Sequence, residues 1–497
     1  MSENQPSYRK IMKATSVFGG VQVFTILISI IRSKFIALFL GSAGMGIVGL
    51  LNSTIGLIGG ITNFGLGTSA VRDVSVANSS GNIDRIGLVV SVLRRWVWVT
   101  GIFGALIVLL LSPWLSKLTF GNNNYIGVFA LISITLLFNQ LNVGQLAVLQ
   151  GMQKIEYLAK ASLSGSILGL FFTIPLYYFF GIDGIVPSLI IASVVSFVIS
   201  WYFAKKVHIT KSKLTNSLTF SEGKNMLKMG FLISLSGLFV IATTYIIQLF
   251  ITSRGGVQQV GLFTAGFAVI NTYVGLVFTA MGTDYFPRLS SVAESNELCR
   301  KTINQQAEIS ILILGPIIMM FLVFIKLIII ILYSNTFVAI EEMVLWLAIA
   351  TFFKSAAWCI GFILLAKGAS KIFFWSEFVA NSYMLLFDLA GYYFWGLTGL
   401  GISFFIGYLV CFAQVFFISR RKYHFFFDSS FLKIFAFQFS LAICCFLIVK
   451  FIDKPYSYLY GSILILFSIL HSYIQLDKRL GIKTIINKFL NNRFKKR

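Results

Sequence analysis

The chain has 497 residues, of which 57% are hydrophobic and only 11% are charged. A soluble domain carries about 25% charged residues, so this composition argues against a soluble enzyme. Lys and Arg outnumber Asp and Glu by 40 to 17, a surplus that nucleic-acid-binding proteins also show. The positions of the basic residues along the chain decide between a nucleic-acid binder and a membrane protein.

Long apolar stretches follow one another along almost the whole chain. A membrane-spanning helix needs about 20 apolar residues, and we predict fourteen such helices at residues 14–40, 44–69, 93–114, 125–149, 161–180, 184–204, 229–253, 259–285, 308–332, 341–366, 372–394, 398–419, 431–452 and 457–476. The 3 His and 5 Cys residues show no metal-ligand spacing, so we predict neither a metal site nor a catalytic site. The predicted fold class is an all-α polytopic membrane protein.

The basic residues gather on alternate connections and at both chain ends, most densely in the polar segments 205–228 and 477–497. Under the positive-inside rule this pattern predicts that both termini are cytoplasmic. We predict a multi-pass protein of the bacterial inner (cytoplasmic) membrane, with the basic linker in contact with anionic membrane lipids. The basic surplus then mainly fixes orientation, and no nucleic-acid partner is expected.

Three short motifs recur in the same order in the two halves of the chain. They pair residues 44–50 with 256–262, 151–155 with 368–372, and 177–184 with 392–399, at offsets of 212, 217 and 215 residues. Six helices per repeat, an even number, give both halves the same orientation, and two facing bundles enclose a cavity. We predict an N-terminal lobe (1–204), a cytoplasmic linker (205–228), a C-terminal lobe (229–419), two additional helices (420–476) and a basic cytoplasmic tail (477–497).

The segment IRSKFIALFLGSAGMGIVGLLNS and the junction YYFFGIDGI resemble polysaccharide flippases of the Wzx (O-antigen) type. These proteins belong to the MOP exporter superfamily, together with MATE exporters and MurJ-like lipid II flippases. The resemblance implies two MATE-like six-helix lobes that alternate access. It also implies transport of an undecaprenyl-diphosphate-linked oligosaccharide, O-antigen or a similar repeat unit, from the cytoplasmic to the periplasmic leaflet. A polysaccharide polymerase and a chain-length regulator are the protein partners that such a function implies.

Charged residues inside membrane helices are the strongest site candidates, because each costs about 2.5–3.5 kcal/mol to insert. Helix 14–40 carries a polar stripe that we expect to face the cavity, formed by Gln22, Thr25, Ser29 and Arg32. Arg32 would offer forked donors to a diphosphate or an acidic sugar. Lys34 is a second candidate cation, and the alternative for both is that they extend to the headgroups. Asn142 and Gln145 could bind sugar hydroxyls or bridge helices.

Helix 372–394 carries a second stripe, formed by Glu377, Asn381 and Asp388. Its carboxylates need partners or protons, and Lys354 in helix 341–366 is the nearest candidate cation. The group could bind a coupling H⁺ or Na⁺, or a structural ion pair could join the two helices. Lys354 is also a predicted cavity cation. Asp284 and Arg288, which flank a proline, are predicted gate residues, with an exposed helix cap as the alternative.

These residues together predict a transporter with no covalent chemistry and no cofactor. Arg32, Lys34 and Lys354 favour an anionic cargo, so a lipid-linked oligosaccharide flippase is the main hypothesis. The alternatives are a lipid II-type flippase and a MATE-type ion-coupled exporter, although an exporter of cationic drugs would be expected to have an acid-lined cavity. A polymerase, ligase or glycosyltransferase would need catalytic acids or His on sizeable outer loops, and the outer loops are short and nearly free of acids.

Overall fold

The computed structural model describes residues 5–210 and 215–480, and every regular element in these ranges is a helix. The chain divides into two compact units. Unit 1 comprises Met1–Thr264 and Leu332–Thr336, and unit 2 comprises Ala265–Ile331 and Phe337–Arg497. The predicted lobes, 1–204 and 229–419, remain a prediction, and most of the predicted basic tail lies beyond residue 480, outside the described residues.

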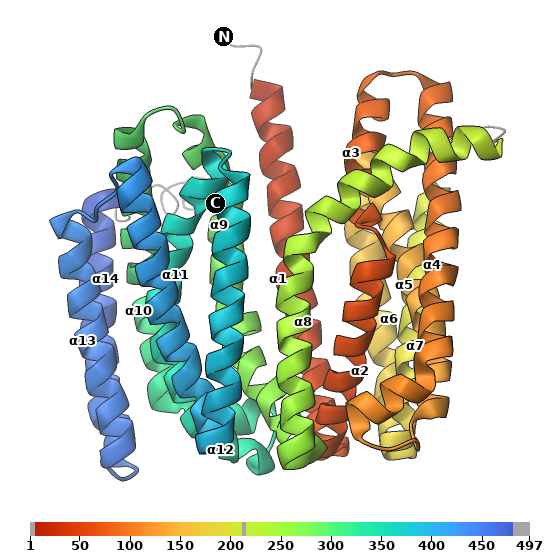
Figure 1. The fold of residues 1–497 in the computed structure, drawn as a ribbon. Coiled ribbons are helices and arrows are strands. Elements are labelled where there is room, and N and C mark those ends of the chain that lie inside the picture. The colour runs from red at the N-terminus through yellow and green to blue at the C-terminus, as the bar shows by residue number, and fades with distance from the viewer. Residues whose placement is uncertain (1–4, 211–214, 481–497) are drawn as a thin grey trace, which may run out of the picture. The chain divides into compact units, whose positions relative to one another are not determined.

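The helices are numbered in chain order (Figure 1). Unit 1 contains α1 (Gln5–Phe39), α2 (Gly41–Thr62), α3 (Leu66–Ser79), α4 (Ile83–Phe120), α5 (Ile126–Gly151), α6 (Ile155–Phe180), the short η1 (Gly181–Gly184), α7 (Ile185–Lys205) and most of α8 (Asn216–Ala268). Unit 2 contains the end of α8, η2 (Val269–Val274), α9 (Gly275–Ser291), almost all of α10 (Asn296–Leu332), most of η3 (Asn335–Ile340), α11 (Glu341–Ala366), α12 (Ser370–Tyr423), α13 (Ser429–Phe451) and α14 (Tyr456–Leu480).

Eleven helical stretches among the described residues are long and apolar enough to cross a membrane. Three of them, Ile155–Lys205, Gly237–Ser291 and Ser370–Tyr423, are 51, 55 and 54 residues long. Each contains a glycine with positive φ, namely Gly181, Gly256 or Gly396, and about 20 residues suffice for one crossing. Each is therefore long enough for two crossings, so the eleven stretches accommodate the fourteen predicted helices. The predicted helix 44–69 ends earlier than expected, at Thr62, and a separate helix α3 follows.

The internal repeat is visible as a repeat of backbone turns. Residues with positive φ form three pairs, each 215 residues apart: Gly41 and Gly256, Gln153 and Gly368, and Gly181 and Gly396. The same backbone hydrogen bond closes the second pair of turns, from Lys154 to Leu149 and from Ala369 to Leu364. The offset is thus constant, and the sequence matches at offsets of 212 and 217 residues were misaligned by two or three residues.

The turn that joins α6 to α7 recurs inside α12. Gly181 (φ 55°, ψ −130°) and Gly396 (φ 56°, ψ −138°) adopt nearly the same conformation, which side-chain-bearing residues rarely reach. Three residues later, a Cβ at Gly184 would overlap the carbonyl of Leu176, and a Cβ at Gly399 would overlap the carbonyl of Gly391. Two glycines per turn therefore let each pair of antiparallel helices approach closely.

The second half of the predicted linker is a docked helix. α8 begins at Asn216, and Figure 1 shows its first half running obliquely across the ends of α3 and α4. Its buried residues recur at helical spacing, at Thr219, Gly223, Met226 and Gly230. The indole Nε1 of Trp96 on α4 donates to the carbonyl of Thr219 (3.1 Å), and Met226 joins a core cluster of α3, α4 and α5. The described part of this segment thus belongs to the packed body of unit 1.

Candidate functional site

The first candidate group lies in unit 1, where α1 packs against α6. Arg32 is half-buried, and its Nη2 lies 3.6 Å from the position that a Cβ would occupy at Gly169 of α6. The missing side chain leaves space for the guanidinium beside α6. The Nε atom of Arg32 is buried without a hydrogen-bond partner in the described part of the chain. A buried donor without an acceptor costs free energy. We therefore expect Arg32 to bind an acceptor that the described residues do not supply.

The rest of the α1 stripe surrounds Arg32 only in part. Gln22 and Ser29 are exposed, whereas Thr25 is half-buried and donates to the carbonyl of Val21 on its own helix (2.8 Å). Exposed polar side chains on a membrane helix face either water or other polar groups. Among the described residues, the stripe therefore has two exposed polar side chains, Gln22 and Ser29, on the same helix as Arg32.

Lys34 has a structural contact that the sequence did not predict. Its Nζ donates to the backbone carbonyl of Tyr333 (2.6 Å), in the segment Leu332–Thr336 that groups with unit 1. Lys34 thus ties the end of α1 to a segment 299 residues away in sequence. Its predicted role toward an anionic cargo stays a prediction beside this anchoring role.

The α5 candidates lie on a different helix pair. Asn142 is half-buried, and Gln145 is buried at 7% exposure, where α5 packs against α3, α4 and α7. The Oε1 atom of Gln145 is buried with no hydrogen-bond partner among the described residues. The neighbouring Gln140 is satisfied, because its Nε2 donates to Thr100 on α4 (2.9 Å). Gln145 is thus, like Arg32, one of several buried polar side chains of unit 1 with an atom that has no partner among the described residues.

The second candidate group lies in unit 2, on the first half of α12. Asp388 is 7% exposed, and it forms no ion pair or hydrogen bond with any described residue. Glu377 and Asn381 are half-buried, and the Nδ2 atom of Asn381 donates to the carbonyl of Glu377 (2.8 Å). A buried acid without a partner in the protein needs a proton or a cation.

Lys354 on α11 does not pair with these acids in the described structure. Its Nζ donates to Oδ1 of Asn271 (2.7 Å). It also lies within 5.4–5.9 Å of the ring centroids of Phe278, Phe404 and Tyr408, a distance range typical of cation–π contacts. The aromatic rings and the amide therefore stabilise the ammonium without a counter-ion, and the ion pair between α11 and α12, one of the two predicted alternatives, is not formed.

The predicted gate residues meet at the end of α9. Arg288 Nε lies 3.8 Å from Asp284 Oδ2, one turn apart on the same helix. Arg288 Nη2 donates to Oε1 of Gln306 on α10 (2.7 Å). Both charged side chains are exposed, at 41% for Arg288 and 82% for Asp284. Such an exposed pair contributes little to stability, and it links two neighbouring helix ends within unit 2.

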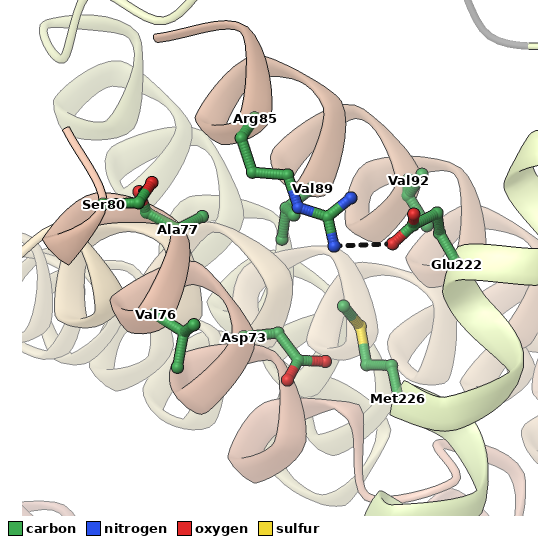
Figure 2. A pocket seen from close by; sticks show the side chains of 9 residues that line it. All are labelled: Asp73, Val76, Ala77, Ser80, Arg85, Val89, Val92, Glu222 and Met226. Atoms are coloured by element: carbon green, nitrogen blue, oxygen red, sulfur yellow. Dashed lines mark hydrogen bonds and ion pairs between the residues drawn. The ribbon is translucent and has the colours of Figure 1, made fainter. Parts of the chain in front are cut away.

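A polar pocket of about 340 Å³ in unit 1 was missed by the sequence reasoning. Figure 2 shows the Arg85 guanidinium directed at the Glu222 carboxylate (2.8 Å), with Asp73 and Met226 in the same pocket wall. The hydrogen bond from Arg85 lowers the pKa of Glu222, whereas partial burial raises the pKa of Asp73. These residues lie in segments predicted as connections, and no pattern in the sequence brings Asp73 and Arg85 together with Glu222.

Solved structures show which fold this arrangement represents. The lipid II flippase MurJ in an inward closed conformation superimposes with a TM-score of 0.72 at 13% identity, over 93% of this chain and 99% of that chain. An inward-facing MATE family multidrug resistance transporter of the MOP superfamily gives a TM-score of 0.65 at 14% identity, over 81% of this chain and 94% of that chain. The protein is thus a multi-pass helical membrane protein with the fold of MOP-type transporters.

The family follows from the sequence. Residues 35–342, more than half of the chain, match the family model described as polysaccharide biosynthesis protein, and the chain belongs to this family. The Shigella flexneri protein named "Putative O-antigen transporter" is 25% identical over 76% of this chain and 90% of its own length. The lipid III flippase of Escherichia coli (strain K12) is 20% identical over 78% of this chain and 94% of its own length.

Proposed function

We propose that the protein is a flippase for an undecaprenyl-diphosphate-linked oligosaccharide, O-antigen or a similar repeat unit. It moves this lipid from the cytoplasmic to the periplasmic leaflet of the bacterial inner membrane, without covalent chemistry. Membership in the polysaccharide biosynthesis family and the similarity to proteins named as an O-antigen transporter and a lipid III flippase support this proposal. The structural observation that carries it is the buried, unpartnered Nε of Arg32.

The physical argument starts from the cargo. A diphosphate cannot enter hydrocarbon without losing its hydration, a cost of many kcal/mol, so it needs a polar path that supplies compensating donors. A guanidinium presents several N–H groups in one plane and binds phosphate oxygens in pairs. Arg32 has an Nε donor with no acceptor among the described residues and lies beside the buried Gly169 of α6, while the polyprenyl tail of the cargo stays in the lipid.

Transport requires the polar path to open to each side in turn. We assign this motion to alternating access of the lobes 1–204 and 229–419, with both chain ends cytoplasmic as the basic residues indicate. The acidic stripe of Glu377, Asn381 and Asp388 is the proposed binding site for a coupling H⁺ or Na⁺, because Asp388 has no protein partner in the described residues. A polysaccharide polymerase and a chain-length regulator would take up the exported repeat unit.

The test is the exchange of Arg32 in a strain that depends on this protein for its surface polysaccharide. We expect Arg32→Ala to lower transport roughly 10- to 100-fold, the range for a lost charge-assisted hydrogen bond of about 1.5–3 kcal/mol. Arg32→Lys keeps the charge without the fork and should retain part of the activity. Lys117→Gln, which removes an exposed cation from the last turn of α4, is the matched control.

The measurement is the leaflet distribution of the lipid-linked oligosaccharide, together with the amount of surface polysaccharide. Arg32→Ala should accumulate the lipid on the cytoplasmic side while the protein remains in the membrane at the level of the unmodified chain. Normal surface polysaccharide in this variant would contradict the proposed cationic path through Arg32. Accumulation of a peptidoglycan precursor instead would assign the protein to lipid II-type transport.

A further inference from the structure

A second groove lies in unit 2, between α13 and α14, and none of the residues assigned to transport lines it. It encloses about 290 Å³ and is lined by Ser430, Lys433, Ile434, Phe437, His471 and Gln475. These residues belong to the early turns of α13 and the late turns of α14, so the groove lies at the end of the hairpin where α13 begins and α14 ends. None of the described residues that line it is a carboxylate.

The buried Gln438 beneath the groove determines which atoms of His471 can donate. Its Nε2 lies 2.9 Å from Oγ of Ser472 and 3.3 Å from Nδ1 of His471, and its Oε1 accepts a hydrogen bond from Ser468 (2.6 Å). The same nitrogen also lies 3.4 Å from the backbone carbonyl of Ser468. Because an amide nitrogen only donates, its contact with Nδ1 favours the His471 tautomer that carries the ring proton on Nε2. The imidazole that lines the groove therefore keeps one free N–H donor.

Arg479 at the end of α14 determines which atoms of Gln475 and Ser430 are already hydrogen-bonded. It donates to Oε1 of Gln475 (2.7 Å) and to Oγ of Ser430 (2.8 Å). The side-chain carbonyl oxygen of Gln475 thus accepts a hydrogen bond, whereas its –NH₂ group has no acceptor among the described residues. Arg479 also pairs with Glu308 of α10 (2.7 Å), so the charge of this carboxylate is already neutralised.

Lys433 completes a set of donors without acceptors. Its side chain is exposed, and it forms no hydrogen bond or ion pair with the described residues. The groove therefore presents an ammonium, an imidazole N–H and an amide –NH₂ beside the apolar surface of Ile434 and of Phe437, which is 42% exposed. This combination has the chemistry of an anion site with an adjoining apolar wall.

We propose that this groove binds the phosphate headgroup of an anionic membrane phospholipid. The phosphate oxygens accept from Lys433, His471 and Gln475, and an acyl chain of the same lipid runs along the exposed ring of Phe437. The position between two membrane-spanning helices favours a lipid over a free ion, because only a lipid also covers the apolar wall. The inference is independent of the cargo, since it uses none of the residues proposed for transport.

The test measures lipid retention by the full-length protein in a neutral detergent, using native mass spectrometry with added phosphatidylglycerol. A basic residue near an anionic lipid surface contributes about 1 kcal/mol, so we expect Lys433→Gln to weaken binding roughly fivefold. Lys433→Arg should retain binding. The matched control is Lys371→Gln, because Lys371 is an exposed lysine in the first turn of α12, and its loss should leave the affinity unchanged.

Two further binding measurements identify the molecule that occupies the groove. Phosphatidylcholine has the same chains without net negative charge, and equal binding of this lipid by the unmodified protein would overturn the proposal of an anionic headgroup. Inorganic phosphate has the charge without the chains, and displacement of phosphatidylglycerol by phosphate at equal concentration would overturn the proposal of a lipid. Equal lipid affinity of Lys433→Gln and the unmodified protein, with equal thermal unfolding midpoints, would exclude this groove as the site.

Discussion

The α6–α7 pair of unit 1 and the two halves of α12 in unit 2 share one backbone design but differ in charge. Their turn glycines, Gly181 and Gly396, are 215 residues apart and have nearly the same φ and ψ. At the same offset, the acidic stripe of Glu377, Asn381 and Asp388 corresponds to the neutral residues Ser162, Ser166 and Thr173. The duplicated element is therefore the hairpin, and the ionisable groups belong to only one copy.

The cations, like the acids, each occur in only one copy of the repeat. The position 215 residues after Arg32 is Ile247, which is buried at 5% exposure. Lys354 corresponds to Asn139 of unit 1. Because a membrane charge costs free energy wherever it stands, its presence in one copy alone points to a task that the other copy does not share. The comparison thus assigns the proposed cargo contact of Arg32 to the first copy of the repeat and the proposed ion site to the second copy.

The largest effect should come from filling the shared turn, because both copies need it. Gly184→Ala and Gly399→Ala each place a Cβ against a backbone carbonyl, that of Leu176 or of Gly391, and overpacking costs about 1–3 kcal/mol. We expect both variants to lower the thermal unfolding midpoint in detergent by similar amounts. Gly59→Ala and Gly361→Ala are matched controls, because a Cβ at either site meets nothing within 4 Å. A large effect in only one copy would contradict the shared design.

The second prediction concerns the residues that differ between the copies. Asp388→Asn removes the buried acid and should lower ion-driven transport roughly tenfold, within the range of typical coupling free energies. The equivalent change in unit 1, Thr173→Val, should leave the ion dependence unchanged. The measurement is flipping in proteoliposomes under an imposed H⁺ or Na⁺ gradient. Equal ion dependence of Asp388→Asn and the unmodified protein would remove this acid from the coupling site.

A double variant of Lys354 and Asp388 distinguishes ion coupling by Asp388 from a structural ion pair between the two residues. Lys354 bonds to Asn271 and contacts three aromatic rings, and it makes no ion pair with the acids of α12 in the described residues. The stability effects of Lys354→Gln and Asp388→Asn should therefore add within about 0.5 kcal/mol. An interaction free energy between the two substitutions well above this value would support the structural ion pair that the sequence analysis gave as an alternative.

The sequence predicted the membrane helices because length and hydropathy determine them locally, and the eleven apolar stretches accommodate all fourteen. It missed α3 and the first half of α8, since both are short or polar segments whose helices are stabilised by packing, as the burial of Met226 shows. Helical periodicity predicted the stripes of Arg32 and Asp388. It could not predict their partners, because contacts such as that from Lys34 to Tyr333 join residues 299 positions apart.

The smallest expected effects concern two arginines near the starts of corresponding helices. Arg85, in the first turn of α4, bonds to the carboxylate of Glu222 (2.8 Å), and these side chains are 45% and 32% exposed. Arg300, in the second turn of α10, lies 4.0 Å from the ring centroid of Phe426. Exposed ion pairs contribute about 0.2–1 kcal/mol, and cation–π contacts contribute about 0.5–1 kcal/mol at exposed sites and about 2 kcal/mol when desolvated. Arg300 is half-buried, so Arg300→Gln should lower stability by at least as much as Arg85→Gln, and both effects should be small.

The pH dependence of stability distinguishes the two arginines. The hydrogen bond from Arg85 holds the pKa of Glu222 below its ordinary value of 4.5, so the stability from this pair is fully present above pH 4.5 and is lost as the pH falls through the lowered pKa. The difference in unfolding midpoint between the unmodified protein and Glu222→Gln should therefore shrink below pH 4.5. The difference for Arg300→Gln should stay constant, because the phenyl ring of Phe426 does not titrate. A Glu222→Gln difference that persists undiminished at pH 3 would show that packing of the side chain, and not its charge, holds α8 against α4.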